Sequence, residues 1–374
     1  MRLPSLCGAL ALWGVPAVLL APILAAGLAP IFAQDANLAA KPPVAETKVA
    51  SSDTTKKTLA HGKAAKPAGP PAKELFGAVK TPAPLAPSAI GFYARGCLAG
   101  AAVLPSDGVA WQAMRLSRNR NWGHPALVAL VEKLAIDARE HDGWPGLLVG
   151  DISQPRGGPM ASGHASHQVG LDADIWLTPM PDRRLTAQER EDLSAASMLA
   201  EDEVSVDRRV FTDAHVRLLK RAASYPSVER IFVHPAIKQA LCEATAHDSE
   251  RHWLNKVRAY WGHYDHFHVR IACPKGSGTC EAQPALPSDD GCGAELTRWL
   301  ARVKPKPPAP QPRPKVAQVK KPELTLNQLP FECRRVLAKA PGGVAIPAPA
   351  VAATKAPPPV PPAKPPQTSG TTPQ

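Results

Sequence analysis

Two patterns that commonly bind or activate zinc are missing from this sequence of 374 residues. No two cysteines have CxxC spacing, which argues against a site built on cysteine thiolates, and no HExxH motif occurs, so the glutamate base of that motif is not indicated. The chain has no internal repeat, which argues against a solenoid or propeller. Aromatic residues make up only 5% of the chain and are scarce between residues 34 and 88.

Proline, in contrast, is abundant: the chain holds 43, and proline interrupts helices and strands because it removes a backbone donor. Residues 34–90 are mostly Ala, Pro and Lys and cannot bury enough apolar surface to offset chain entropy, so they are expected to form a disordered tether. One domain is expected at 91–302. It is followed by a Pro/Lys-rich spacer at 303–322, a segment at 323–340 that docks back on the domain, and a disordered Pro/Ala-rich tail at 341–374.

The net charge of +12 would suit a nucleic-acid partner if it belonged to the folded domain. Most of the excess Lys and Arg lies in the tether and in residues 303–374, and the remainder of the chain is close to neutral. We therefore expect no nucleic-acid partner and assign the basic charge to solvated tails.

Residues 1–33 have the pattern of an export signal, with Arg2 near the start, a long uncharged apolar run and Ala33 as a small residue at a cleavage site. The alternative is an uncleaved membrane anchor, because the run is long enough to span a bilayer. Pro16, Pro22 and other breakers interrupt it, so we expect cleavage, no stable membrane span afterwards, and a periplasmic protein.

Apart from Cys7 the chain has six cysteines, an even number in a chain expected to be exported, where disulfides are the default. Six cysteines allow fifteen pairings, and spacing alone does not select one. The easiest pairing to form is Cys273 with Cys280, because Gly276 and Gly278 let the short loop between them close.

Hydrophobic periodicity predicts an α+β fold with a small, largely antiparallel sheet flanked by helices and loops. Strands are expected at 147–151, 170–177, 228–234 and 265–271, and helices at 125–134, 186–200, 213–224, 235–245 and 250–260.

Two short stretches, 162–176 and 261–270, concentrate five of the twelve histidines and three aspartates. Alternate side chains of a strand share a face. The second stretch therefore has His266, His268 and Arg270 on one side, and the first has Asp172, Asp174 and Trp176 on one side, with apolar residues on the other. If the stretches meet, they form a polar floor above an apolar underside.

Two imidazoles, one carboxylate and a water molecule suit a catalytic zinc, which needs an open coordination position. His167, Asp174 and His268 supply that set. The sequence therefore predicts Zn²⁺ as a cofactor at the place where the two stretches meet.

The spacing of His167, Asp174 and the run His266-Phe267-His268 resembles the zinc signature of lysostaphin-type endopeptidases, D-Ala-D-Ala carboxypeptidases and hedgehog domains. The fuller strings at 163–174 and 261–268 are similar to the penicillin-insensitive murein endopeptidases, over a region from about residue 91 to residue 337.

The resemblance implies that His167, Asp174 and His268 are zinc ligands, that His266 is the catalytic base or stabilises the transition state, and that His263 assists the reaction. It places His164 at or beside the metal. It also implies three disulfides, which join Cys97 with Cys333, Cys242 with Cys292 and Cys273 with Cys280.

Other polar residues have a structural and a functional interpretation. Asp172 could orient a ligand histidine from the second coordination shell, or cap a turn. Arg156, with the two glycines after it, could bind a substrate carboxylate or belong to a plain turn. His234 ends a strand and could approach the site, but a structural role as a helix cap is favoured. His124, which also precedes a proline, is interpreted as a residue at the start of a helix.

The expected function is that of a periplasmic zinc murein endopeptidase that hydrolyses the D-Ala to meso-diaminopimelate cross-links of peptidoglycan without a serine nucleophile, and so is insensitive to β-lactams. Two alternatives stay open. One is a zinc D,D-carboxypeptidase that releases terminal D-Ala, and the other is a non-catalytic, zinc-bearing module that binds the wall. Nothing in the sequence indicates an oligomeric state.

Overall fold

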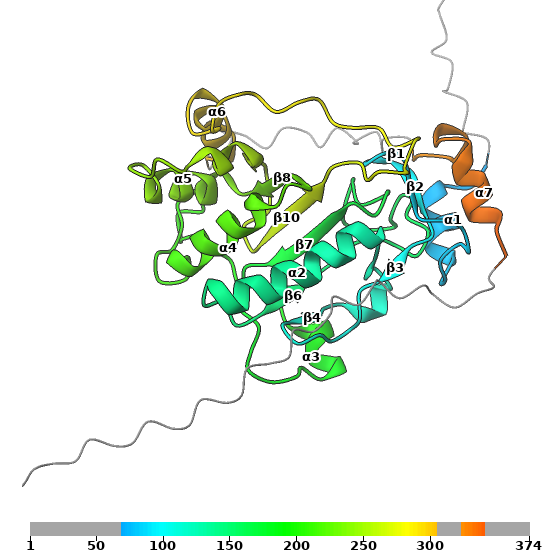
Figure 1. Cartoon of the computed structure of the whole chain (residues 1–374), viewed down its shortest axis with the longest axis horizontal. Helices are drawn as coiled ribbons and strands as arrows, with labels where there is room; N and C mark the ends of the chain where they lie inside the picture. The colour runs from blue at the N-terminus through cyan, green and yellow to red at the C-terminus, as the bar shows by residue number, and fades with distance from the viewer. Residues whose placement is uncertain (1–68, 305–322, 341–374) are drawn as a thin grey trace, which may run out of the picture. The chain divides into compact units, whose positions relative to one another are not determined.

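A six-stranded mixed sheet lies at the centre of the residues that the computed structural model describes, 69–304 and 323–340 (Figure 1). The predicted signal at 1–33, most of the tether, the spacer and the tail lie outside these residues. The strands follow the order β4 (Trp111–Ala113), β6 (Leu147–Val149), β7 (Asp172–Trp176), β10 (His266–Ile271), β8 (Val228–Val233) and β9 (Val257–Ala259).

The three central pairings, β6 with β7, β7 with β10 and β10 with β8, are antiparallel, and the two outer pairings are parallel. The register sets His268 opposite Asp174 and Phe267 opposite Ile175. The predicted α+β fold with a largely antiparallel sheet is confirmed.

Helices α2 (Pro125–His141) and α4 (Asp213–Ser224) cover the apolar face of the sheet (Figure 1). Leu127 and Leu218 are fully buried in one cluster with Ala173, Ile175 and Val269 of the two central strands. Burying one leucine side chain contributes about 1.5–3 kcal/mol. Packing thus fixes which face of β7 and β10 points inward, and the alternate residues must point to the other face.

Two helices begin with the same three residues, His-Pro-Ala. In α2, His124 Nδ1 accepts a hydrogen bond from the N–H of Ala126, and in α5 (Pro235–Ala244), His234 Nδ1 accepts one from Ala236, each at 3.2 Å. Burial lowers the pKa of both histidines to about 4, so both rings stay neutral and can accept at neutral pH. Both histidines are helix caps.

The prediction of a helix at 250–260 is wrong. The chain forms a short 3₁₀ helix, η2 (His252–Lys256), and then strand β9, which pairs in parallel with β8. The backbone groups of 257–259 form hydrogen bonds with the neighbouring strand β8 instead of within a helix. Pairing with a distant part of the chain thus overrides the weak helix propensity of this segment.

The predicted helix at 186–200 is shorter, because α3 covers only Ala187–Asp192. Beyond it the backbone bonds to distant partners: the N–H of Ala196 donates to Thr178 Oγ1 and that of Met198 to the carbonyl of Tyr264. These bonds hold residues 194 and 195 as a loop beside the polar face of the sheet.

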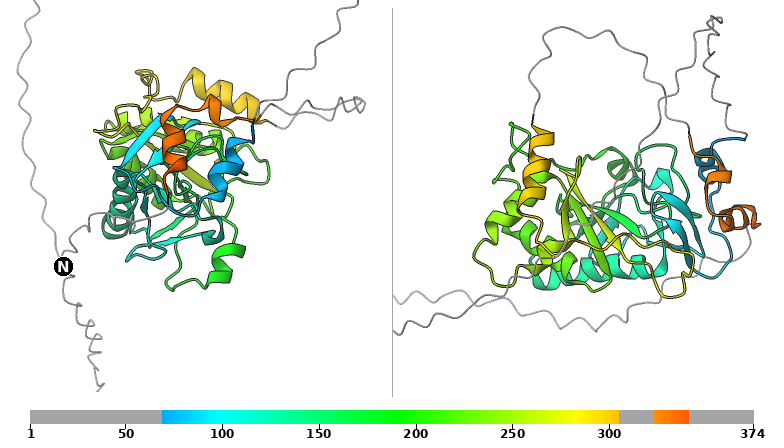
Figure 2. Two further views of the ribbon diagram at one scale, coloured as in Figure 1. Left: turned by 90° about the vertical axis from the view of Figure 1, so that its right-hand side faces the viewer. Right: turned by 90° about the horizontal axis from the view of Figure 1, so that it is seen from above.

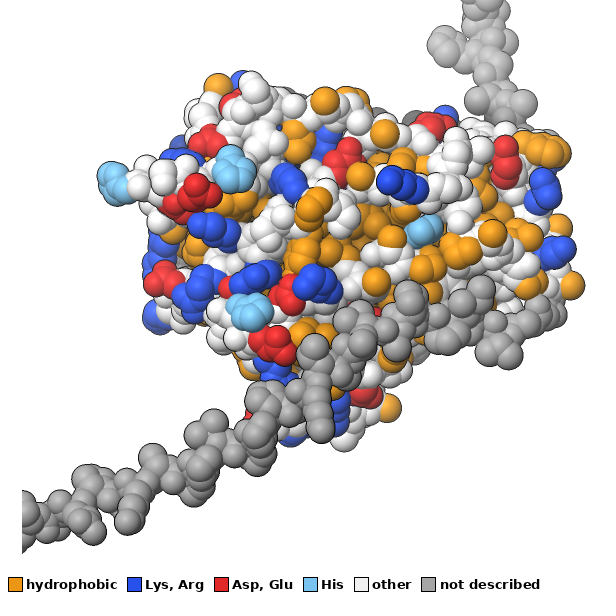
Figure 3. Space-filling view, viewed as in Figure 1, with side chains coloured by type: hydrophobic (Ala, Val, Ile, Leu, Met, Phe, Trp, Pro, Cys, Tyr) orange, Lys and Arg blue, Asp and Glu red, His pale blue; other side chains and the backbone are white. Residues whose placement is uncertain are grey.

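The remaining elements connect or flank the sheet. They are β1 (Ser88–Phe92), β2 (Arg95–Ala99), β3 (Ala102–Val103), η1 (Leu116–Arg118), β5 (Trp122–Gly123), α6 (Ala294–Val303) and η3 (Leu326–Gln328). None of the helices within 69–304 and 323–340 has the length and apolar character needed to cross a bilayer. Figure 3 shows one face, on which lysine and arginine side chains lie among acidic ones over α4 and α5.

The two ends of the described chain meet beside β2. Helix α1 (Ala72–Ala78) and helix α7 (Glu332–Ala338) lie side by side (Figure 2). The N–H of Ala72 donates to the carbonyl of Leu324 at 2.8 Å, and Phe76 is buried in one cluster with Val336. Residues 69–90, expected to belong to the tether, are therefore structured.

Three disulfides are present in the described residues, and they are the pairs that the resemblance implies: Cys97–Cys333, Cys242–Cys292 and Cys273–Cys280. The first closes a loop of 236 residues and attaches α7 to β2. A cross-link across so long a loop restricts the unfolded chain strongly.

The contacts of Arg156 favour the structural one of the two interpretations of its loop. Its side chain is buried, and its guanidinium donates to the carbonyls of Thr81, Val336, Leu337 and Lys339 at 2.7–3.1 Å. Three of these carbonyls belong to the end of α7, where the last turn of a helix has no internal donors. Arg156 is a structural residue that caps α7.

Removing this guanidinium is expected to destabilise the fold. Arg156→Ala leaves the buried carbonyl of Val336 and three part-buried carbonyls without this donor and should lower the free energy of unfolding by roughly 3 kcal/mol, measured by urea denaturation. Arg183→Ala, which removes an exposed arginine paired with Glu189, is the control and should leave stability nearly unchanged. An unchanged denaturation midpoint for Arg156→Ala would contradict the capping role.

Candidate active site

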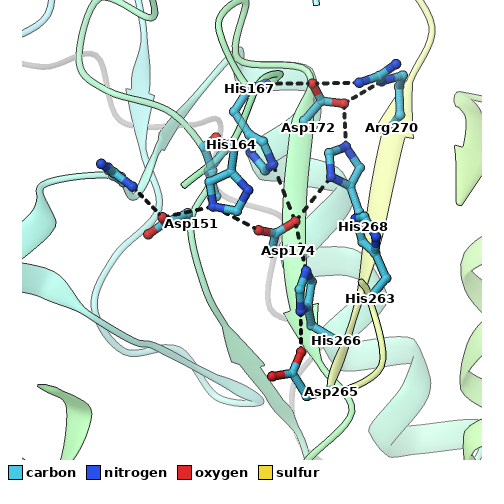
Figure 4. Close-up of polar contacts among 12 residues, drawn as sticks. Asp151, His164, His167, Asp172, Asp174, His263, Asp265, His266, His268 and Arg270 are labelled. Atoms are coloured by element: carbon cyan, nitrogen blue, oxygen red, sulfur yellow. Dashed lines mark hydrogen bonds and ion pairs between the residues drawn. The ribbon is translucent and has the colours of Figure 1, made fainter. Parts of the chain in front are cut away.

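Asp174 is the centre of the polar face of the sheet, and four histidines surround its carboxylate (Figure 4). Oδ1 lies 3.4 Å from His167 Nε2, 3.3 Å from His268 Nδ1 and 3.8 Å from His266 Nε2, and Oδ2 lies 3.4 Å from His164 Nε2. The two stretches that the sequence singled out therefore meet at one carboxylate.

The loop before β7 orients the His167 ring. His167 has a left-handed backbone conformation (φ 67°), its N–H donates to Asp172 Oδ2 at 3.0 Å, and Nδ1 lies 2.6 Å from the carbonyl of Ile152. A carbonyl can only accept, so Nδ1 carries the proton. The lone pair of His167 Nε2 therefore points at Asp174.

The neighbouring strand orients His268 in an equivalent way. Its Nε2 lies 2.9 Å from Asp172 Oδ1, and the carboxylate of Asp172 also accepts from Arg270 Nε at 2.6 Å. Because Nε2 donates to Asp172, the lone pair of His268 is on Nδ1 and faces Asp174. Asp172 is thus placed to orient a histidine, as one of its two sequence interpretations proposed.

These residues fit a metal ion. His167 Nε2 and Asp174 Oδ1 are buried and have no hydrogen-bond partner, although the two lone pairs and the carboxylate oxygen converge. Three acceptors without a donor repel one another unless a cation or a proton lies between them. The ligand atoms of His164, His167 and Asp174 lie within 4.8 Å of one another and could hold an ion.

His164 and His268 are both close enough to Asp174 to complete the group, but their surroundings differ. His164 Nε2 also lies 3.1 Å from Asp151 Oδ2, whose carboxylate accepts from Arg120 at 2.8 Å. Its side chain is 24% exposed, against 5% for His268. A nitrogen that donates to Asp151 has no lone pair for a metal, so we favour His268, with His164 at the rim.

His266 and His263 lie on the open side of Asp174. His266 Nδ1 lies 2.6 Å from Asp265 Oδ1, so Asp265 fixes the ring with Nε2 toward Asp174. His263 Nδ1 lies 2.9 Å from the carbonyl of Trp261, and its ring centroid lies 5.0 Å from that of His266. Both imidazoles thus keep Nε2 free of other protein partners.

The close packing of histidines and carboxylates shifts the pKa values of Asp174 and His268. Burial would raise the pKa of Asp174, but His167, His266 and His268 outweigh that effect and hold it well below its usual range. Burial would lower the pKa of His268, yet the carboxylates of Asp172 and Asp174 raise it. The imidazoles and the carboxylate therefore share protons as one tightly coupled group.

The site opens into a cleft of about 220 Å³. Sequence reasoning missed Asp151 and Asp265, which hold His164 and His266, and the side chains of Arg115 and Arg118 in the cleft wall. Trp176, which also lines the cleft, was predicted on the same strand face as Asp174. Asp151 is the last residue of the strand predicted at 147–151 and lies just beyond the observed β6, and a carboxylate at the end of a buried strand was the available signal. The arginines come from η1 and its flanks, and no local pattern connects them to the site.

Comparison with known proteins agrees with this geometry. The family model described as penicillin-insensitive murein endopeptidase matches residues 89–338. The chain belongs to this family. The match contains every residue of the site described above, both central strands and all three disulfides.

Individual relatives carry the same name. A penicillin-insensitive murein endopeptidase from Haemophilus influenzae is 43% identical over 252 residues, which is 67% of this chain and 82% of that protein. Relatives of that name from Pectobacterium atrosepticum and Escherichia coli are 41% and 40% identical, over 59% and 61% of this chain and 76% and 81% of their own lengths.

Asp172 offers a direct test of the site. Asp172→Asn keeps the shape but leaves the buried Arg270 without its counter-charge, which should cost roughly 3–5 kcal/mol in urea denaturation. It also weakens the orientation of His268, so affinity for a divalent metal ion, measured with Zn²⁺ as the probe in competition with a chromogenic chelator, should fall about 10- to 100-fold. Asp207→Asn, which loses only a contact with exposed Arg209, is the control. Unchanged stability and affinity would contradict the role given to Asp172.

Proposed function

We propose that this chain is a zinc-dependent murein endopeptidase that hydrolyses D-Ala to meso-diaminopimelate cross-links of peptidoglycan. The observation that carries the proposal is the convergence of the His167 and His268 lone pairs on Asp174 in a chain of this family. A periplasmic location is proposed with it, because the substrate is a cell-wall polymer and residues 1–33 have the pattern of an export signal.

His167, Asp174 and His268 are the proposed zinc ligands. Atoms about 2.0–2.1 Å from a tetrahedral zinc lie roughly 3.3–3.4 Å from one another, and His167 Nε2 and His268 Nδ1 lie 3.4 and 3.3 Å from Asp174 Oδ1. When bound, zinc supplies Lewis-acid polarisation of a peptide carbonyl and lowers the pKa of water.

The protein's own histidines handle the proton. His266, held by Asp265 through Nδ1, has Nε2 free to take a proton from the attacking water and to return one to the leaving amine. His263 lies beside it; its Nδ1 donates to the carbonyl of Trp261 and burial lowers its pKa to about 3, so its Nε2 is a neutral acceptor that can assist His266 in handling the proton. Both act from the open side of Asp174, where the cleft admits a substrate.

Digestion of purified muropeptides by the protein, with identification of the products, tests this function against the carboxypeptidase alternative. An endopeptidase should convert cross-linked dimers to monomers without releasing free D-Ala, monitored by liquid chromatography with mass spectrometry. A chelator should abolish the conversion and Zn²⁺ should restore it. Release of free D-Ala alone, with dimers left intact, would overturn the endopeptidase assignment.

Two histidine substitutions separate catalysis from metal binding. His266→Ala should keep zinc, measured by atomic absorption, and lower kcat by about 100-fold or more, because it removes the proton-transfer group. His268→Ala should lose both zinc and hydrolysis. His247→Ala, on the surface, should match the unmodified protein in both measurements. A fully active His266→Ala variant would refute the role of His266.

A further inference from the structure

Exposed aromatic side chains gather next to the site in a chain that is poor in aromatics. Of the six large apolar side chains that are exposed within the described residues, three lie at 260–264: Tyr260, Trp261 and Tyr264. Trp261 is 67% exposed. A cluster of this kind beside a cleft marks a binding surface more often than a lone exposed apolar residue does.

The rings form a continuous path that starts at the site. The centroid of His266 lies 5.0 Å from that of His263, His263 lies 5.8 Å from Tyr260, and Tyr260 lies 5.4 Å from Trp299 of α6. Trp261 lies 5.8 Å from Tyr260 with an angle of 34° between the ring planes. Tyr260, Trp261 and Trp299 are called the aromatic strip below.

Regular structure holds two rings of the strip, those of Tyr260 and Trp299. The N–H of Tyr260 donates to the carbonyl of Val233 at 2.9 Å and so extends the pairing of β9 with β8. Helix α6, which carries Trp299, is attached to β9 by an ion pair between Glu295 and the buried Arg258. Tyr260 and Trp261 are exposed and Trp299 is half-buried, so an anchored tyrosine and a helical tryptophan flank the more exposed Trp261.

We propose that the aromatic strip binds the glycan of murein and thereby positions the peptide cross-link at Asp174. This inference rests on the proposed function and adds a saccharide-binding subsite to it. The faces of sugar rings present C–H groups to the electron-rich faces of indole and phenol rings, while their hydroxyl groups stay in water. An uncharged sugar suits these neutral rings better than the acidic peptide stem does.

The length of the path fits this substrate. A peptide stem of four residues separates a cross-link from the sugar that carries it, and four extended residues span about 14 Å. Successive ring centroids on the path from His266 through His263 and Tyr260 to Trp299 are 5.0, 5.8 and 5.4 Å apart. The His266 and Trp299 rings can therefore be no farther apart than the sum of these distances, which is comparable to the length of the stem. A stem with its cross-link at the site can therefore bring its sugar to the strip.

Binding to peptide-free glycan tests the subsite without turnover. Glycan strands stripped of peptides by an amidase are titrated into the full-length His266→Ala protein by calorimetry. Trp261→Ala or Trp299→Ala in that protein should weaken binding about five- to ten-fold, the loss expected for one stacking partner, and Trp261→Phe should restore most of it. Phe331→Ala, which removes an exposed ring on another part of the surface, is the control and should bind normally.

A second comparison identifies what the strip contacts. With His266 intact, Trp261→Ala should lower kcat/KM for disaccharide-bearing dimers about five- to ten-fold more than for the same dimers without sugars. Equal losses on both substrates would assign the strip to the peptide and overturn the proposal. Absence of glycan binding, or a dimer of the chain that Trp261→Ala dissociates, would overturn it too. Failure of the proposed function would appear separately, as intact dimers with the unmodified enzyme.

Discussion

The site depends on the buried carboxylate of Asp172. It accepts from the N–H of His167, from His268 Nε2 and from the guanidinium of Arg270, and its exposed fraction is 0%. A buried carboxylate is tolerated only when its oxygens are fully paired. By satisfying that requirement, Asp172 joins the loop before β7 to strand β10 and fixes which nitrogen of His268 carries a proton.

Arg270 transmits the same constraint into the core. It lies opposite Asp172 in the antiparallel register, and its guanidinium carbon lies 4.0 Å from the centroid of the Tyr93 ring. The Tyr93 hydroxyl donates to the carbonyl of Ile271 at 2.9 Å. The ion pair below the site is therefore enclosed by an aromatic ring and a strand, and its charges are shielded from water, which strengthens their attraction.

The alternation of side chains between the two faces of strands 172–176 and 266–271 could be predicted from the sequence, because it depends only on residues that are neighbours in the chain. Burial of Ile175 and Val269 against α2 and α4 requires Asp174 and His268 to share the opposite face, and the register then brings them together. The caps at His124 and His234 were equally accessible, since a histidine before Pro and Ala at a helix start is a short-range pattern.

What the sequence left open or predicted wrongly depends on partners far along the chain. Arg156 has the loop context of a ligand-binding residue, and only the carbonyls at 336–339 make it structural. Residues 257–259 form a strand because β8 offers them an unpaired edge. The order of residues 69–90 likewise requires the segment at 323–340, which contributes the carbonyl of Leu324 to Ala72 and the side chain of Val336 to the cluster around Phe76.

The core and the site lie on opposite faces of the same two strands, so the strand register cannot change at the site without changing in the core. A shift of one residue between β7 and β10 would turn the apolar face outward and bury the histidines at once. The register that orients His268 is thus maintained by hydrophobic burial of Phe267 and Val269, a larger free energy than the imidazole contacts supply. The site is rigid because the core beneath it excludes every other register.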